Sequence, residues 1–439
     1  MLGLARHSWR RSTALLVCRP LPATSPIFAL PPRTSRRSFI LLLAALSTIG
    51  PFSIDTFLPA LPALQVALGA SSLQAQQALS AYLAGFAVMS LWHGAISDAV
   101  GRRPVVLASL AVYAAAAVVC TFAPTIEVLI SARLVQGLSG GVGMIISRAI
   151  IRDCYEGPLA QKTMSNVMVI FAIAPAIAPV FGGYLHQWLG WRSIFAFMLI
   201  ASLLLWLWVW RSLPETLPLA ARQPLKPAAL WHSYAEVFAA REFQLLAAAL
   251  AFNFSTFFVY VMASPAFILN HLHLTSTDFG WFFLPVIGGM MLGNRVANRL
   301  AGRMSPRRTV FLGFAVMGSG VLLNLAAQFF VAPGLAPGAW LTFISVAPIV
   351  VATIGQPMVT TILQLMVMDL FPAKRGMMSS CMGFTHVMVS ALTAGVIAPH
   401  VADTAQHLGL ASAAFFLTGS GFWLTYFLAR RTAVPAPRR

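Results

Sequence analysis

The chain has 439 residues, of which 59% are hydrophobic and only 9% carry a charge, and its mean hydropathy is +0.80. Soluble proteins carry a charge on about a quarter of their residues. An ordinary soluble enzyme or binding domain is therefore excluded, and we expect an integral membrane protein. Because about 20 apolar residues span a bilayer, the length allows a dozen helices.

The net charge of +18 would suggest a nucleic-acid partner in a soluble domain. Here the Lys and Arg residues lie in short connections between apolar segments, which is typical of membrane topology, so we expect no nucleic-acid partner. The four cysteines form no CxxC pair, which argues against a disulfide framework or a metal site.

Residues 1–38 contain seven arginines and no acid. This composition fits a basic cytoplasmic tail, a transit-like segment, or translation from a start upstream of the true one. We favour a basic tail.

Apolar windows bounded by charges or by Pro and Gly clusters predict an all-α polytopic protein. The twelve predicted transmembrane helices lie at 39–64, 76–97, 104–123, 126–148, 162–188, 192–211, 243–269, 279–301, 308–331, 338–368, 376–400 and 409–430.

The longest hydrophilic connection divides these helices six and six. We therefore predict a six-helix half at 39–211, a cytoplasmic central loop at 212–242, a second six-helix half at 243–430 and a basic cytoplasmic tail at 431–439. Two such halves are typical of a duplicated transporter with its substrate site between them, near mid-membrane.

With the amino terminus in the cytoplasm, only Arg133 and Arg192 of the 29 Lys and Arg residues lie in outer-half or external positions. The positive-inside rule favours this orientation. We expect a multi-pass protein of the inner (plasma) membrane with both termini cytoplasmic.

The connection after the second helix, GAISDAVGRRP at 94–104, has glycines, an acid and paired arginines at a spacing that resembles the signature loop of the major facilitator superfamily. The resemblance implies the major facilitator fold and a cytoplasmic latch that stabilises one access state. The latch residues would be Gly94, Asp98, Gly101, Arg102 and Arg103.

We expect Gly94 to let another helix approach closely. Asp98 should accept charge-assisted bonds from Arg102, or from Arg148 or Arg152 at the end of the fourth helix. Ala99 departs from the family, which usually has a basic residue there. The alternative is a basic loop that only sets topology.

The fourth helix contains RLVQGLSGG at 133–141, which is similar to the family's RxxQG motif. At about 100° per residue, one helix face holds Arg133, Gln136, Gly137, Gly140 and Gly141. Small residues there allow tight packing beside a polar pair. An intramembrane arginine is a functional candidate, and its alternative role is that of a structural cation bonded to carbonyls.

The fifth helix contains APAIAPVFGG at 174–183, which looks like the motif associated with antiporters of the superfamily, with alanine where glycine more often precedes each proline. Pro175 and Pro179 stand one turn apart, and each frees a backbone carbonyl. We therefore expect a bent gating helix that includes Gly182 and Gly183; the alternative is a kinked helix of the kind that static membrane proteins also contain.

The first helix carries one acid, Asp55, followed by LPALP at 58–62. With the motifs above and WLGWRSIF at 188–195, this resembles the bicyclomycin/chloramphenicol-resistance (Bcr/CflA) type of drug:proton antiporter over most of residues 39–430. The resemblance implies that Asp55 couples transport to protons.

Helix geometry is consistent with that role. Asp55 stands about 24 Å along a helix that begins at Phe39, roughly 6 Å from the outer edge of the membrane core, and Arg133 lies about 10 Å below the same edge. Burial favours a neutral carboxyl group and a nearby Arg133 favours the carboxylate, so Asp55 and Arg133 together can form a proton switch. The alternative is a helix-end carboxylate that snorkels to the outer surface.

By analogy with the cavity-facing helices of this fold, polar and aromatic residues of both halves are predicted to line the substrate cavity, and the alternative role for each of them is packing against lipid or a neighbouring helix. They are Tyr82, Phe86, Asn166, Phe171, Asn253, Phe257, Tyr260, Gln356, Met382 and His386.

The leading interpretation is a monomeric transporter that exports small, largely apolar drugs in exchange for protons by alternating access. It would be driven by the proton gradient, without a cofactor or metal, and the chain contains no GxxxxGK[ST] phosphate loop. A proton-coupled importer of a small metabolite is the first alternative. A channel or a membrane-embedded enzyme is the second, although neither a selectivity segment nor a nucleophile with a matching base is visible.

Overall fold

The computed structural model describes residues 36–371 and 374–433, and these form helices joined by short turns, with no strand among them. The predicted tails at 1–38 and 431–439 lie almost entirely outside the described residues.

The first half contains the six predicted helices, two of them interrupted. Its elements are α1 (Arg36–Asp55), η1 (Leu58–Ala60), α2 (Leu61–Leu68), α3 (Ser72–Val100), α4 (Arg102–Thr121), α5 (Ile126–Gly140), α6 (Val142–Cys154), α7 (Gly157–Leu189) and α8 (Arg192–Ser212). The first predicted span is thus built from α1, η1 and α2, and the fourth from α5 and α6.

The connection between the halves is partly helical, with η2 (Leu219–Ala221) and α9 (Pro227–Ala239). The second half contains α10 (Arg241–Met262), η3 (Ala266–His271), α11 (Gly280–Leu300), α12 (Pro306–Ala326), η4 (Ala327–Val331), η5 (Ala332–Gly334), α13 (Ala339–Leu370), α14 (Arg375–Leu392), η7 (Thr393–Ile397), α15 (Ala398–Val401) and α16 (Ala405–Ala433). Of these, η3, η4 and η7 are π-helical.

Eleven helical segments of the described chain are long and apolar enough to cross a membrane. The remaining predicted span, 279–301, is also a helix, α11, although it is not among these eleven; its last third contains Asn294, Arg295, Asn298 and Arg299. The predicted all-helical polytopic fold is confirmed.

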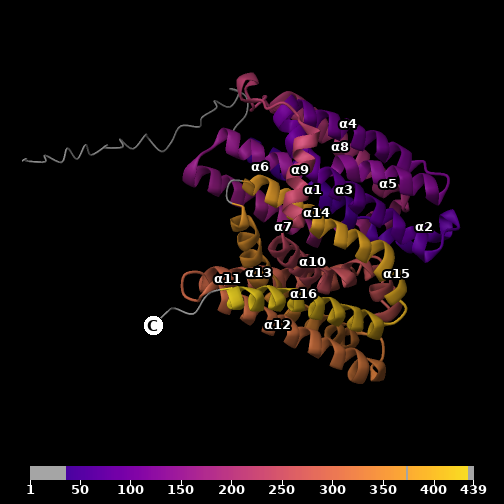
Figure 1. The fold of residues 1–439 in the computed structure, drawn as a ribbon. Coiled ribbons are helices and arrows are strands. Elements are labelled where there is room, and N and C mark those ends of the chain that lie inside the picture. Colours follow the sequence, from indigo (N-terminus) through magenta and orange to yellow (C-terminus); the bar gives the residue numbers. More distant parts are fainter. Residues whose placement is uncertain (1–35, 372–373, 434–439) are drawn as a thin grey trace, which may run out of the picture.

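Figure 1 shows two helical bundles, one formed by α1–α8 and the other by α10–α16, with α14 running along the first bundle. Each half has its own apolar core, and a third cluster of buried residues crosses the boundary between them. In that shared cluster, Leu79 and Leu83 of α3 join Val261 of α10 and Ala394 of η7. The halves are therefore packed together over part of their facing surfaces.

The first span breaks close to its acid. Helix α1 ends at Asp55, and the chain resumes in η1 and α2, where Pro59 and Pro62 occupy first-turn positions that need no backbone N–H donor. Helix α2 continues to Leu68, four residues beyond the predicted end. About 20 Å of helix follows Asp55, so this residue lies nearer the middle of the helical span Arg37–Leu68 than the predicted helix end at residue 64 implied.

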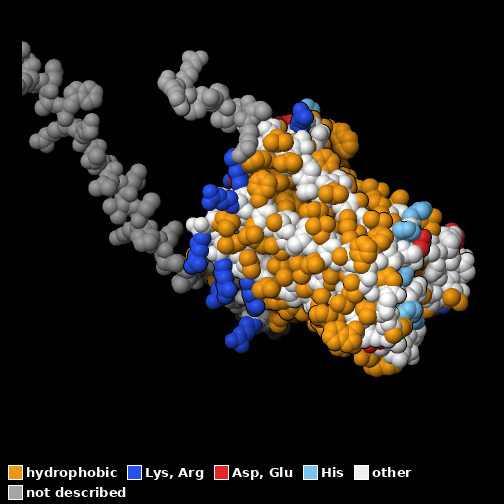
Figure 2. Space-filling model, turned by 90° about the horizontal axis from the view of Figure 1, so that it is seen from below, with side chains coloured by type: hydrophobic (Ala, Val, Ile, Leu, Met, Phe, Trp, Pro, Cys, Tyr) orange, Lys and Arg blue, Asp and Glu red, His pale blue; other side chains and the backbone are white. Residues whose placement is uncertain are grey.

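Charge is distributed unevenly between the two ends of the molecule. Figure 2 shows Lys and Arg side chains gathered at one end, whereas most of the histidines in view lie at the other. We call the first the arginine-rich end and the second the histidine end. The predicted orientation would place the arginine-rich end in the cytoplasm.

Candidate functional site

Arg133 of α5 is completely buried inside the first half. Its guanidinium donates to Gln136 Oε1 at 2.9 Å and to the backbone carbonyl of Ser53 at 2.9 Å. The Ser53 hydroxyl is in turn bonded to the Tyr113 hydroxyl. Arg133 therefore connects α5 to the last turn of α1, directly before the break in the first span.

Aromatic rings surround the same guanidinium. Its central carbon lies 4.4 Å from the ring centroid of Tyr82, 5.2 Å from that of Phe57 and 5.9 Å from that of Phe195. Ring faces attract a desolvated cation by about 2 kcal/mol. The charge is thus stabilised by rings and carbonyl oxygens, and no described carboxylate lies within ion-pair distance of it.

Asp55 ends α1 and is only 6% exposed. Among the described residues its carboxyl group has neither an ion-pair partner nor a hydrogen-bond partner. A carboxylate that snorkels to the surface would have a larger exposed fraction than this. An unpaired buried acid is costly as an anion, so its protonation is sensitive to any change in its surroundings.

Several buried polar atoms of the first half also lack a partner within the part of the chain that the structure describes. They are the Nε of Arg133, the Nε2 of Gln136, the hydroxyl of Tyr82 and the hydroxyl of Thr56. All of them can donate a hydrogen bond to a carboxylate. A movement of the helix break that brings Asp55 to one of these donors would give it a partner that it lacks in this conformation.

The glycines of α5 pack against α3, as the shared-face prediction required. A Cβ atom at Gly137 would lie 2.0 Å from the Tyr82 carbonyl oxygen, and one at Gly140 would lie 2.5 Å from the Tyr82 hydroxyl. On α3, a Cβ at Gly85 would lie 2.5 Å from the Leu134 carbonyl oxygen. With α3 and α5 this close, the Tyr82 ring lies over the Arg133 guanidinium.

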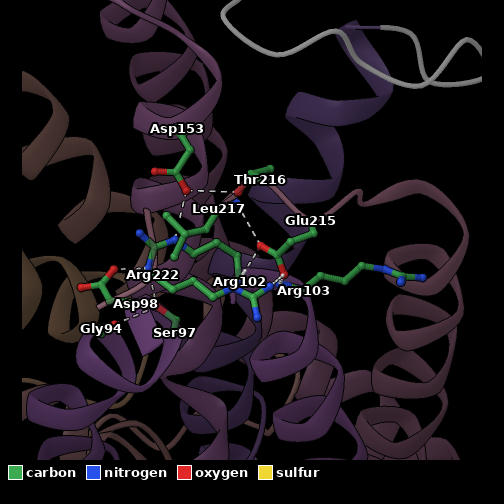
Figure 3. Close-up of polar contacts among 10 residues, drawn as sticks. All are labelled: Gly94, Ser97, Asp98, Arg102, Arg103, Asp153, Glu215, Thr216, Leu217 and Arg222. Atoms are coloured by element: carbon green, nitrogen blue, oxygen red, sulfur yellow. Dashed lines mark hydrogen bonds and ion pairs between the residues drawn. The ribbon is translucent and has the colours of Figure 1, made fainter. Parts of the chain in front are cut away.

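At the arginine-rich end, Arg102 connects three elements (Figure 3). Its guanidinium contacts Asp98 Oδ1 of α3 at 2.5 Å, Asp153 Oδ2 of α6 at 3.0 Å and the Ser97 hydroxyl at 2.7 Å. The predicted bond between Asp98 and Arg102 is thus present. We call Asp98, Arg102 and Asp153 the latch.

A second acid, Glu215, anchors the same corner. Its carboxylate accepts from the backbone N–H groups of Arg102 at 2.9 Å and Arg103 at 3.2 Å, at the first turn of α4. Arg222 lies 3.8 Å away, and the Thr216 hydroxyl donates to Asp153 at 3.1 Å. The segment after α8 therefore fastens α4 to α6.

Asp153, Glu215 and Thr216 were missing from the predicted site, because their partners lie 51 to 113 residues away in the sequence. The expected contacts of Asp98 with Arg148 or Arg152 do not form in the described structure; the fourth span contributes Asp153 to the latch instead.

The glycines of this loop differ in their roles. A Cβ atom at Gly94 would meet nothing within 4 Å, so the expected close approach of another helix at Gly94 is wrong in this conformation. Gly101 is different, because its φ of +114° disfavours any other residue and its Cβ would lie 2.5 Å from Glu215. Arg103 donates to the Trp210 carbonyl at 2.7 Å, which ties α4 to α8.

Replacement of Glu215 by Ala is expected to destabilise the protein by about 1–2 kcal/mol, because the first turn of α4 loses its capping carboxylate. Thermal unfolding in detergent measures this effect. The matched control is Glu127→Ala, since Glu127 is an exposed first-turn acid of α5 whose side chain makes no described hydrogen bond. Equal unfolding temperatures for the two variants would contradict the capping role.

Helix α7 contains Pro175 and Pro179 within one continuous helix. Just beyond them, a Cβ at Gly182 would lie 2.1 Å from the Thr56 carbonyl oxygen, and one at Gly183 would lie 1.9 Å from the Ser276 carbonyl oxygen. Gly182 thus packs on the break after Asp55, and Gly183 packs on the other half. These two glycines therefore allow the backbone of α7 to lie close to both segments.

These motifs occur in a chain that matches a known family. A family profile described as Major Facilitator Superfamily matches residues 41–395. The chain belongs to the Major Facilitator Superfamily.

Curated relatives in the superfamily cover much of the chain. The uncharacterized MFS-type transporter YdgK of Bacillus subtilis is 32% identical over 302 residues, which are 67% of this chain and 74% of that protein. A bicyclomycin resistance protein homolog of Haemophilus influenzae is 27% identical over 368 residues, which are 84% of this chain and 90% of that protein. The relatives thus include the group that the motifs of the first half resemble.

A solved D-xylose-proton symporter superposes with a TM-score of 0.65 at 13% sequence identity, covering 89% of this chain and 96% of that one. This likeness supports the fold alone.

The two halves of this superfamily member are joined at the histidine end by side-chain bonds from α3. The Gln76 amide donates to the Met262 carbonyl at 3.1 Å, and the Ser80 hydroxyl donates to the Ala391 carbonyl at 2.7 Å. Met262 is the last residue of α10, and Ala391 precedes the π-helix η7, so both carbonyls lie where regular helix bonding ends. We call these two bonds the outer clasp.

The predicted cavity residues differ in which half they belong to and in how deeply they are buried. Tyr82 and Phe86 are buried in the first half, Tyr82 against Arg133. Asn253 and Tyr260 are buried in the second half, where Asn253 donates to Thr360 at 3.3 Å and Tyr260 accepts from Asn324 at 2.6 Å. Phe257 and Gln356 are also buried, Phe171, Met382 and His386 are half-buried, and Asn166 is exposed.

One aromatic group in the second half joins α10 to α14. The ring centroid of Phe254 lies 4.3 Å from that of His386, 4.9 Å from that of Phe257 and 5.0 Å from that of Phe258. The sequence-based list contains His386 and Phe257 but not Phe254, which is central to the group. A substrate contact for the listed residues stays a prediction.

Proposed function

We propose that this transporter exports small, largely apolar drugs in exchange for protons. Relatives are named for resistance to bicyclomycin and chloramphenicol, which supports drug export. We further propose that the protein works in the inner membrane with both termini in the cytoplasm, driven by the proton gradient and without a cofactor.

The observation that carries the proton coupling is the isolation of Asp55. This acid is buried at the break of the first span, beside Thr56, whose carbonyl abuts α7. Movement of α7 against the break would change the distance from Asp55 to the unpartnered donors of Arg133, Gln136 and Tyr82. Approach to a donor favours the carboxylate and separation favours the neutral acid, so conformational change and protonation become linked.

The described conformation supports a cytoplasm-facing state. At the histidine end, the outer clasp and the contact of Gly183 with Ser276 join the halves directly. At the arginine-rich end, buried residues of α7 become sparse towards its first turns, and α9 connects the halves. We propose that the drug enters from this end and leaves after the outer clasp opens.

The linker helix α9 connects the halves through side chains. The Tyr234 hydroxyl donates to the Leu91 carbonyl of α3 at 2.6 Å, and burial raises the pKa of Tyr234 to about 12, so this donor keeps its proton. Lys374 contacts Glu236 at 2.6 Å, and this hydrogen bond and the lysine charge lower the pKa of the Glu236 carboxyl. The Lys374–Glu236 pair is therefore present above that pKa and is lost as the pH falls through it.

The proposal is tested with purified protein in liposomes that carry an imposed pH gradient. Labelled chloramphenicol should accumulate on the acidic side, and drug addition should release protons that a pH-sensitive dye detects. A proton-coupled importer would instead move the drug down the proton gradient, to the alkaline side. If neither the pH gradient nor a protonophore changes drug transport, proton coupling in either direction is contradicted.

Replacement of Ser80 by Ala is expected to weaken the outer clasp, because the Ala391 carbonyl loses its donor, at a cost of about 1 kcal/mol. The share of molecules open at the histidine end should then rise about fivefold. Distances between spin labels at the ends of α3 and α16 measure this share. Ser319→Ala is the control, since the Ser319 hydroxyl bonds only within α12, and equal distributions would contradict the clasp.

A further inference from the structure

A cavity of about 340 Å³ lies within the second half at the histidine end. Its walls come from the turns after α10 and α12, the first turns of α13, and the turn before α16. None of its lining residues belongs to the first half. The cavity is therefore separate from Asp55 and Arg133.

The backbone around this cavity is irregular on two sides. The π-helices η3 and η4 contribute Phe267, His271 and Gln328. His273 has a φ of +55°, the one positive φ among described residues other than glycine. π-Helical turns and such backbone conformations persist where the surroundings stabilise them, frequently at functional sites.

Hydrogen bonds keep the walls together. The His271 imidazole is bonded to the Ala402 carbonyl at 2.8 Å, and the Gln406 amide donates to the Gln328 carbonyl at 3.1 Å. The Gln328 side chain is 1% exposed, and its Nε2 has no hydrogen-bond partner among the described residues. A buried amide donor without a partner costs about 1–3 kcal/mol, so an acceptor brought by a ligand would be favoured here.

The side chains that line the cavity indicate which kind of ligand it can bind. Asp403 is the only acid in the lining, and no described cation lies within ion-pair distance of it. The lining contains no Lys or Arg, whereas Phe267, Leu335 and Leu341 provide apolar surface. Within the described residues no group of three or more His, Cys, Asp or Glu side chains is placed to bind a metal ion.

We propose that this cavity binds an organic ammonium ion with an apolar body. The cationic group lies at Asp403, the apolar body lies on Leu335 and Leu341, and an acceptor atom of the ligand accepts from Gln328. The ligand is either a free solute or the headgroup of a lipid such as phosphatidylethanolamine, which has the same ammonium chemistry. This site does not depend on the proton coupling of Asp55.

Ligand-observed NMR on the full-length protein in detergent at pH 7.5 tests the charge requirement. Benzyltrimethylammonium should bind, and its neutral carbon analogue neopentylbenzene should bind at least tenfold more weakly. Asp403→Asn should lower the affinity for the cation about tenfold and leave that for neopentylbenzene unchanged. Glu127→Gln, which changes an acid outside the cavity, should leave both affinities unchanged. Loss of cation binding in Asp55→Asn but not in Asp403→Asn would overturn the proposal.

A hydroxylated probe tests the role of Gln328. Benzyl(2-hydroxyethyl)dimethylammonium should bind more tightly than benzyltrimethylammonium, and Gln328→Met should remove this difference while preserving binding of both cations. An unchanged difference would contradict the donor role of Gln328.

Lipid nanodiscs distinguish the two sources of the ligand. Competition with benzyltrimethylammonium by phosphatidylethanolamine, but not by phosphatidylglycerol, would identify the lipid headgroup as the occupant. Equal binding in both lipids would identify a free solute. Absence of cation binding in detergent and in both nanodiscs would overturn the ammonium site.

Discussion

Asp55→Asn is expected to abolish the accumulation of drug driven by a proton gradient. The amide has nearly the shape of the carboxyl group but does not exchange a proton, so the link between conformation and protonation is removed. A membrane potential of 100 mV supplies about 2.3 kcal/mol per proton, enough for roughly a fifty-fold drug gradient in the wild-type protein. In liposomes energised in this way, the variant should show an accumulation ratio near one.

Exchange of labelled for unlabelled drug separates coupling from folding. Because this exchange needs drug binding and reorientation but no net proton movement, Asp55→Asn should retain it. Glu127→Gln makes the same chemical change at an exposed acid and should retain both accumulation and exchange. Normal energised accumulation by Asp55→Asn would remove Asp55 from the mechanism, whereas loss of exchange would show that the substitution damages binding or folding.

Gly137→Ala is expected to be strongly destabilising. A Cβ atom at this position would lie 2.0 Å from the Tyr82 carbonyl oxygen, and backbone of α3 cannot rotate away as a flexible side chain would. Helices α3 and α5 must then separate, at a cost of roughly 3 kcal/mol or more, and the Tyr82 ring loses its position over Arg133. Thermal unfolding in detergent and drug exchange should both decline.

Gly94→Ala is the matched control for this prediction. Gly94 lies inside α3, and its Cβ would meet nothing within 4 Å, so alanine should be tolerated. The higher helix propensity of alanine can raise stability by about 1 kcal/mol. If Gly94→Ala unfolds at a lower temperature than Gly137→Ala, the packing described for these two helices is wrong.

The sequence by itself determined the class of protein and the order of its helices. Length of apolar segments and placement of arginines are local properties, because each span must satisfy its own backbone in the membrane. The spacing within 94–104 likewise predicted the contact of Asp98 with Arg102, and the spacing within 133–141 placed Arg133 and Gln136 on one helix face, where the structure shows them bonded. Arg133 and Gln136 lie three residues apart on α5, and such residues meet whatever the tertiary structure is. Asp98 lies in the last turn of α3 and Arg102 begins α4, so their contact comes from the short turn at Gly101.

The tertiary structure decided the remaining features of the site. Asp153 and Glu215 reach Arg102 only because α6 and the segment after α8 pack against α4, and no local spacing indicates those contacts. Packing also decided that Gly137 meets a neighbouring helix while Gly94 does not. The isolation of Asp55 has the same origin: the break in the first span directs Arg133 to the Ser53 carbonyl, and whether a buried acid finds a cation depends on how separate helices are placed in space.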